Sequence, residues 1–103
     1  MGEGQTSEFF EKAKNLQENN EFESALSCYN KALKLFRQWG DKEDEAETLL
    51  EMGDVYVNLG DYTRSSEHYG LALKLYKKLK DITGQGYSLT GLALVNEKRE
   101  EYE

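Results

Sequence analysis

The residue types that most often serve as nucleophiles, bases or metal ligands, histidine and cysteine, occur once each, and neither has the spacing of a catalytic or metal site. The one histidine, His68, lies between Glu67 and Tyr69, whereas a metal site needs several convergent ligands and a general base needs a nucleophile or a substrate pocket. We therefore expect His68 to be a surface residue. Cys28 has no histidine near it in the sequence, and Lys31 is its closest cation. We expect a half-buried packing thiol rather than a reactive one.

Carboxylates are abundant, but they do not form a ligand motif. One acidic run lies within residues 43–47 and another within residues 97–103, and neither has the Asp/Asn–Gly loop pattern of a calcium-binding hand. Gly84-Gln85-Gly86 has part of a dinucleotide-binding loop, but it follows a predicted helix and lacks the third glycine. We read the runs as solvated helix faces and the glycines as a helix start. The sequence thus predicts no catalytic residue, metal ion or cofactor.

The balance of charge narrows the class of partner. The chain has 20 acidic and 13 basic residues and a net charge of -7, which disfavours both nucleic-acid phosphates and anionic membranes. No apolar run approaches the ~18 residues needed to span a bilayer, and the acidic, glycine-rich residues 1–6 resemble a flexible leader rather than a targeting peptide. A single cysteine fits a reducing compartment. We expect a cytoplasmic protein with a neutral or basic peptide partner, and no nucleic-acid or membrane partner.

The sequence matches itself when it is shifted by 40 residues. Residues 32–36 (ALKLF) align with residues 72–76 (ALKLY), and Tyr29 aligns with Tyr69. A fixed period of this kind is typical of one supersecondary unit stacked repeatedly, in which neighbours bury apolar faces that a single unit leaves exposed.

Apolar residues recur every three or four positions, which predicts helices separated by polar or glycine breaks. We expect helices over residues 7–18, from residue 22 to the stop at Gly40, and from a cap at Asp41 to the stop at Gly60. A fourth helix should cover residues 61–80 and a fifth should start near residues 81–83. Asn20 with Glu23 resembles a capping box for the second helix.

Three departures from regularity lead to expectations about packing. Ser65-Ser66 replaces Ala25-Leu26 one period later, which should loosen the second helical pair. The fifth helix should bury Leu89, Leu92 and Ala93. Asn96 occupies the core position of Leu16 and Tyr56, and we expect it to be incompletely buried at the free end of the stack.

The recurring positions resemble the tetratricopeptide repeat, which alternates bulky, small and aromatic residues around a turn. The second repeat carries Leu49, Gly53, Tyr56, Gly60-Asp61-Tyr62, Ser65, Tyr69 and Ala72, and the first carries Phe9, Ala13, Leu16, Phe22, Ala25, Tyr29 and Ala32. The period of 40 exceeds the usual 34, as in long-helix variants of the family.

This resemblance implies an all-α, α-α superhelix with two antiparallel helical hairpins and a fifth, closing helix. Its repeats would cover residues 7–40 and 41–80, with a partial third repeat over residues 81–103. That third repeat would stop at Tyr102, one residue into its second helix.

In this family the first helices of successive repeats line a concave groove that holds peptide segments. The resemblance places eleven positions of this chain there: Phe10, Lys14, Gln17, Glu47, Leu50, Asp54, Val57, Asn58, Tyr87, Thr90 and Leu94. The alternative is that the apolar residues fill space between repeats and that the charges are ordinary solvated surface.

The resemblance implies a non-catalytic scaffold module for protein–protein interaction. Members that grip chaperone tails use a clamp of lysine, asparagine and arginine around the terminal carboxylate. The matching positions here are Phe10, Lys14, Glu51, Tyr87 and Gly91. None fits, and Glu51 would repel a carboxylate, so we do not expect chaperone tails to bind. The alternatives are a piece of a longer repeat array, suggested by the end at residues 102–103, and a module that self-associates through its fifth helix.

Overall fold

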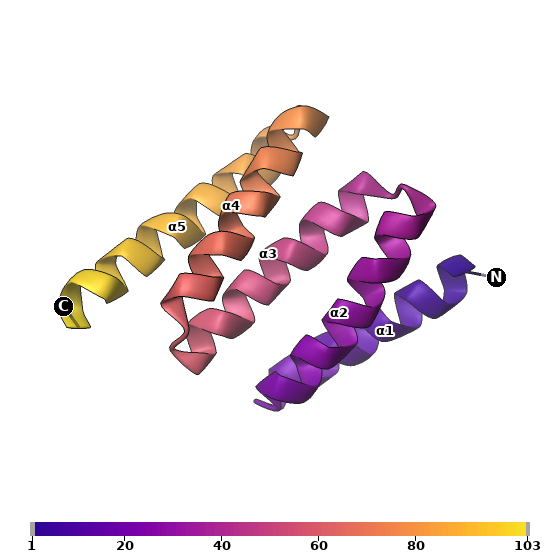
Figure 1. Ribbon diagram of the computed structural model, residues 1–103, viewed down its shortest axis with the longest axis horizontal. Helices are drawn as coiled ribbons and strands as arrows, with labels where there is room; N and C mark the ends of the chain where they lie inside the picture. The colour runs from indigo at the N-terminus through magenta and orange to yellow at the C-terminus, as the bar shows by residue number, and fades with distance from the viewer. Residues whose placement is uncertain (1, 103) are drawn as a thin grey trace.

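A computed structural model describes the backbone of residues 2–102 and the side chains of residues 8–101. Within that part of the chain there are five α-helices and no strand (Figure 1). They are α1 (Gly2–Glu18), α2 (Phe22–Trp39), α3 (Lys42–Leu59), α4 (Tyr62–Leu79) and α5 (Ile82–Tyr102). The predicted all-α class, with two hairpins and a fifth helix, is confirmed. The 40-residue period is also kept, since α2 and α4 begin at residues 22 and 62, and α3 and α5 at residues 42 and 82.

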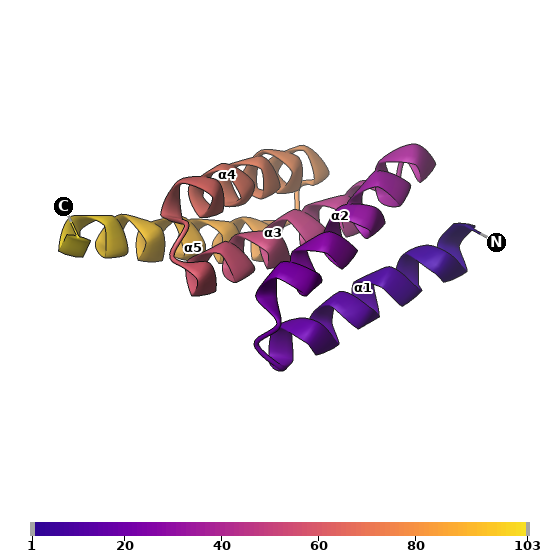
Figure 2. The same ribbon diagram turned by 60° about the horizontal axis from the view of Figure 1, so that its bottom comes forward.

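The helices form two layers, with α1, α3 and α5 in one and α2 and α4 in the other (Figure 2). Each helix packs against the next in sequence, and α3 also touches α5. The molecule measures 46 × 32 × 17 Å, so it is only the two helix layers thick along its shortest dimension. The α1–α3–α5 layer therefore presents a broad face to solvent.

The helix ends follow the turn residues at two of the joints. Asp41 accepts a hydrogen bond from the Asp44 backbone N–H at 3.2 Å, and Asp61 accepts one from the Arg64 N–H at 3.1 Å. Gly40 ends α2 with a φ of 69°; Gly60 likewise ends α3 at 75°. This left-handed region is open to glycine because it has no Cβ. The predicted Asp41 cap and the two glycine stops are confirmed.

The predicted capping role of Asn20 is wrong. Asn20 has a φ of 63° and its N–H donates to the Gln17 carbonyl at 3.0 Å, so it ends α1. The N-cap of α2 is Glu21, which makes no side-chain capping bond. Asparagine tolerates the left-handed conformation better than most residues, and here that property prevails over its capping tendency.

Two helix limits also differ from expectation. The first helix begins at Gly2, so the backbone of residues 2–6, expected to be a flexible leader, is helical. No proline interrupts it, and each added residue contributes one helical hydrogen bond. At the other end, α5 continues to Tyr102, where we expected a second helix to begin. Glu100 stands where Gly60 and Asn20 stand one and two periods earlier, and it does not favour a left-handed stop.

The core lies between the layers and depends on small residues where helices approach closely. Ala13, Ala32 and Ala72 are fully buried, and their small side chains leave room for the neighbouring helix. Ser65 does not loosen the second hairpin as expected. It is fully buried, and its hydroxyl donates to the Gly53 carbonyl at 2.8 Å, so it links α4 to α3. Cys28 is buried more completely than predicted, at 7% exposure.

The buried face of α5 is not the one that we predicted. It consists of Gly84, Ser88, Gly91 and Val95. Of the predicted residues, Leu92 is partly buried, whereas Leu89 is 53% exposed and Ala93 is also exposed. One period earlier, Leu49 and Gly53 are buried. The reason is that α3 is covered on two sides, whereas α5 packs against α4 and α3 only. Asn96 is exposed, as expected.

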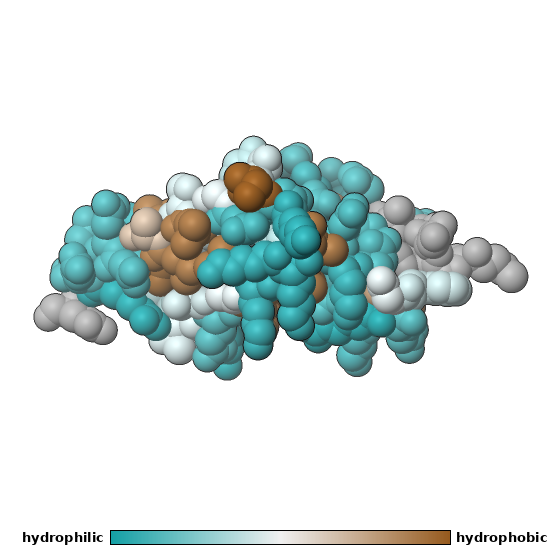
Figure 3. Space-filling model, turned by 90° about the horizontal axis from the view of Figure 1, so that it is seen from above, coloured by the Kyte–Doolittle hydropathy of each residue, from teal (hydrophilic) through white to brown (hydrophobic). Residues whose placement is uncertain are grey.

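Apolar side chains gather on the surface toward the C-terminal end of the molecule, within a mostly hydrophilic exterior (Figure 3). Among the described residues, no helix is both long and apolar enough to span a membrane.

Candidate functional site

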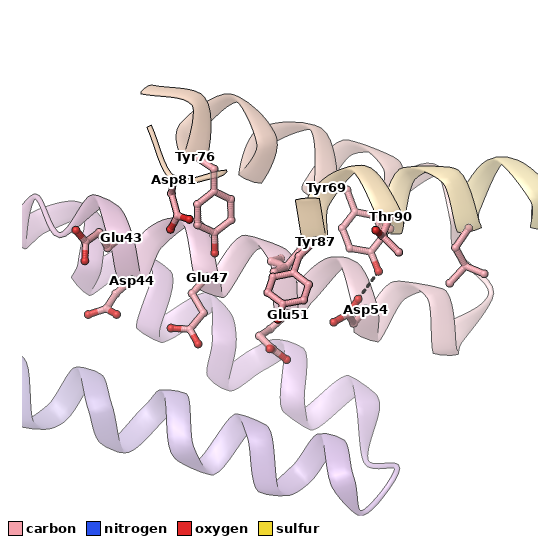
Figure 4. Close-up of a pocket in the computed structure, with 13 residues that line it drawn as sticks. Glu43, Asp44, Glu47, Glu51, Asp54, Tyr69, Tyr76, Asp81, Tyr87 and Thr90 are labelled. Atoms are coloured by element: carbon pink, nitrogen blue, oxygen red, sulfur yellow. Dashed lines mark hydrogen bonds between the residues drawn. The ribbon is translucent and has the colours of Figure 1, made fainter. Parts of the chain in front are cut away.

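A groove of about 630 Å³ opens between α3, α4 and α5 (Figure 4). Most of its carboxylates come from α3, its deeper aromatic rings from α4, and its outer wall from α5. The lining residues are Glu43, Asp44, Glu47, Leu50, Glu51, Asp54, Tyr69, Tyr76, Asp81, Tyr87, Thr90, Gly91 and Leu94.

Glycines on the neighbouring helices allow the two α4 tyrosines to reach this groove. A Cβ added at Gly53 would lie 2.6 Å from Cε1 of the Tyr69 ring, and a Cβ added at Gly91 would lie 2.6 Å from Cζ of the same ring. A Cβ at Gly84 would lie 2.2 Å from the Tyr76 ring. Real Cβ atoms are not found this close to a ring. The two rings thus occupy space that the Cβ of any other residue at these glycine positions would fill. Packing therefore fixes the positions of the rings.

The Tyr69 hydroxyl donates a hydrogen bond to the Asp54 carboxylate (Figure 4). In the first hairpin, the equivalent Tyr29 hydroxyl donates to Gln17 Oε1 at 2.6 Å. Burial, together with the nearby carboxylates, raises the pKa of both tyrosines, and it raises the pKa of Tyr76 to about 12. All three hydroxyls are therefore neutral at physiological pH and act as hydrogen-bonding groups.

The electrostatic character of the groove is strongly acidic. Six of its lining residues are carboxylates, and none is lysine, arginine or histidine. Burial, helped by the neighbouring Asp41, raises the pKa of Asp44 to about 6. The pKa of Glu51 and that of Asp54 are raised as well, in both cases chiefly by burial. Carboxylates that are partly desolvated and close together favour a bound cation, because it offsets their repulsion.

These carboxylates do not form a metal centre. Among the described residues, no group of three or more histidine, cysteine, aspartate or glutamate side chains is placed to hold a metal ion. His68 lies at the surface of α4, with its Nδ1 2.8 Å from the Arg64 carbonyl.

The eleven predicted groove residues fall into several places. Six line the groove: Glu47, Leu50, Asp54, Tyr87, Thr90 and Leu94. Three line a second hollow of about 410 Å³ between α1 and α3: Lys14, Gln17 and Asn58. Phe10 is partly buried against the core, with its ring centroid 5.6 Å from that of Tyr29. Val57 is partly buried and lines neither hollow.

Sequence reasoning missed several groove residues. They are Glu43, Asp44, Glu51, Tyr69, Tyr76, Asp81 and Gly91. Both tyrosines are largely buried, at 1% and 7% exposure. The sequence signal for these two tyrosines was the presence of Gly84 and Gly91. A helical glycine leaves room for a large ring from a neighbouring helix to extend toward the surface.

The fold and the groove together define an α-helical repeat protein with an open concave face. The family comparison makes the assignment specific: the model of the tetratricopeptide repeat matches residues 9–78. This is more than half of the chain, which therefore belongs to the tetratricopeptide-repeat family. Repeats of this family are typically non-catalytic and mediate protein–protein interaction. No curated protein matches the chain.

Proposed function

We propose that this protein is a non-catalytic interaction module that holds a basic peptide segment of a partner in the α3–α4–α5 groove. The observation that carries the proposal is the composition of the groove, which combines six carboxylates with leucine and tyrosine walls and has no cation. The buried Cys28 thiol is compatible with the reducing cytoplasm, where we place this function.

The walls favour a segment in which apolar and basic residues alternate. Leu50 lies within the groove, and Tyr87 and Leu94 are 63% and 40% exposed at its edge. A partner's apolar side chain would bury these surfaces, which contributes roughly 25 cal/mol per Å². Arginine or lysine side chains on either side would meet Glu47 and Glu51. Such a small site favours micromolar affinity, because apolar burial must first offset the cost of ordering the peptide.

The test is a fluorescence-anisotropy titration with a labelled peptide of alternating leucine and arginine, beside the same peptide with glutamate for arginine. The arginine peptide should bind and weaken as salt is raised, and the glutamate peptide should not bind. Leu50→Asp should weaken binding about tenfold, equivalent to about 1.4 kcal/mol. Its matched control is Leu59→Asp, which places the same charge at a 40% exposed leucine outside the groove. Equal losses in both variants would overturn the assignment of the site.

A second candidate function is self-association through α5, which the exposed residues on the outer side of this helix favour. Ile82 is 78% exposed and Leu89 53% exposed, and their spacing of seven places them on one helix face together with Ala93. Sedimentation over a range of protein concentrations tests it. A dimer that Leu89→Glu converts to monomer would support this function, and a monomer at every concentration would exclude it.

A further inference from the structure

Apart from the groove and the hollow between α1 and α3, a cleft of about 230 Å³ lies where the C-terminal halves of α2 and α4 meet the start of α3. Its lining residues are Arg37, Lys42, Glu45, Leu49, Leu71, Lys74, Leu75 and Lys78. No lining residue is shared with the groove. Any ligand of this cleft is therefore independent of the peptide proposed above.

The charge of the cleft is opposite to that of the whole chain. Four of its lining residues are cations and one is a carboxylate, although the chain has a net charge of -7. Glu45 is already engaged, since its Oε2 lies 3.0 Å from Arg37 Nε and its Oε1 lies 3.5 Å from Lys42 Nζ. Across the described side chains, neither Lys74 nor Lys78 forms an ion pair. The α4 side of the cleft thus has two cations available to a ligand.

The apolar part of the cleft lies beside these two lysines. Leu71, Lys74, Leu75 and Lys78 follow the i, i+3, i+4, i+7 spacing of one helix face. Leu71 is 48% exposed and Leu75 is partly buried, and the buried Leu49 lines the cleft as well. Leucine side chains next to lysines match a ligand that has an apolar side chain flanked by carboxylates.

We propose that this cleft binds an acidic segment of a partner protein. An apolar side chain of that segment packs on Leu71 and Leu75, and its flanking carboxylates pair with Lys74 and Lys78. Charge complementarity favours this occupant, because the chain as a whole is acidic whereas the cleft has an excess of cations. The pairing of Glu45 with Arg37 shows that the cleft already accommodates one carboxylate.

The test is an anisotropy titration of the full chain with a labelled peptide in which leucines are flanked by aspartate and glutamate. The control peptide has asparagine and glutamine at those positions. We expect the acidic peptide to bind, to weaken with salt and to exceed the amide peptide by about tenfold, or about 1.4 kcal/mol. Lys74→Glu with Lys78→Glu should abolish this preference. The same double variant should gain affinity for the lysine version of the peptide.

The matched control is Lys12→Glu with Lys77→Glu, which changes the net charge equally at exposed lysines outside the cleft. It should retain at least half of the affinity. An equal loss in the two double variants would show a general charge effect and overturn the proposal, as would equal binding of the acidic and amide peptides. Displacement of the peptide by an oligonucleotide of equal charge, at lower concentration than by the unlabelled peptide, would assign the cleft to phosphates instead. Protein dimers that only the Lys74/Lys78 variant loses would make a second copy the occupant and also overturn it.

Discussion

The groove and the cleft use similar apolar residues but differ in charge and in rigidity. Both contain leucines, yet the groove has six carboxylates and the cleft four cations. The groove walls are tyrosine rings packed on glycines, whereas the cleft is bordered by exposed lysine side chains. In the cleft, Lys74 and Leu75 keep the residue types of Lys34 and Leu35 one period earlier. In the groove, Asp54 stands where the other repeats have Lys14 and Leu94. The charge of the groove therefore depends on a residue that breaks the period, whereas the α4 wall of the cleft includes periodic residues.

The largest expected effect comes from a substitution that disturbs the packed tyrosine wall of the groove. Gly53→Val should destabilise the fold by about 2–3 kcal/mol, because the new side chain would overlap the Tyr69 ring. The ring has little room to move, since it also packs closely against Gly91. The substitution should also weaken binding of the arginine peptide to the groove and leave binding of the acidic peptide to the cleft unchanged. Urea unfolding and the two anisotropy titrations measure these changes.

The control for that variant is Gly70→Val, in the middle of α4. A Cβ at Gly70 would meet nothing within 4 Å, so the change should alter the free energy of unfolding by less than about 0.5 kcal/mol. A comparable loss at both glycines would show that valine is poorly tolerated in these helices wherever it is placed, and that the Tyr69 contact does not govern the result.

A smaller effect should come from pH, and it should affect the groove alone. The pKa of Asp44 is raised from 3.8 to about 6 in the folded protein, so above pH 6 its ionised form opposes folding. Lowering the pH from about 7 to about 5 protonates it, so the free energy of unfolding should rise. We expect about 1 kcal/mol, because much of the side chain remains solvated.

The same protonation removes negative charge from the groove, so the arginine peptide should bind more weakly at the lower pH. Urea unfolding of the wild-type protein and of Asp44→Asn at both values measures the effect on stability. A rise of equal size in Asp44→Asn would assign it to other groups, such as Glu51 and Asp54, whose pKa is also raised.

The smallest effect is expected at the cleft. Arg37→Gln removes the ion pair with Glu45, and because Arg37 is exposed the loss should be below about 0.5 kcal/mol. The acidic peptide should bind only slightly less well, since Lys74 and Lys78 remain. A loss of more than about 1 kcal/mol by thermal unfolding would mean that the cleft is as rigidly built as the groove, and the contrast between the two would fail.

Much of the fold followed from local signals in the sequence. The period, the Asp41 cap and the glycine stops were enough to place most helix boundaries. The errors arose where one residue type can take either of two structural roles, or where burial depended on how many helices pack against a residue. Asn20 could cap one helix or end another, and only the backbone conformation decides. The α5 stripe was inferred from Leu49 and Gly53, but α5 lacks the second neighbour that buries those residues in α3.

The site was less accessible from the sequence than the fold. The resemblance placed positions on the first helices of the repeats, and six of them line the groove. It could not indicate that Tyr69 and Tyr76 reach the same groove from α4, because this depends on glycines from two other helices meeting one ring. The cleft was also unseen, since Arg37 and Lys78 are distant in sequence and come together only when α2 and α4 align along α3.

The separation of acidic and basic residues into two hollows that share no lining residue gives the molecule a permanent electric dipole. Six carboxylates belong to the α3–α4–α5 groove and four cations to the α2–α3–α4 cleft. In solution such a body rotates in the field of an approaching charged macromolecule before the two touch. A basic target would thus meet the concave side first and an acidic one the other, so orientation during diffusion itself contributes to selectivity.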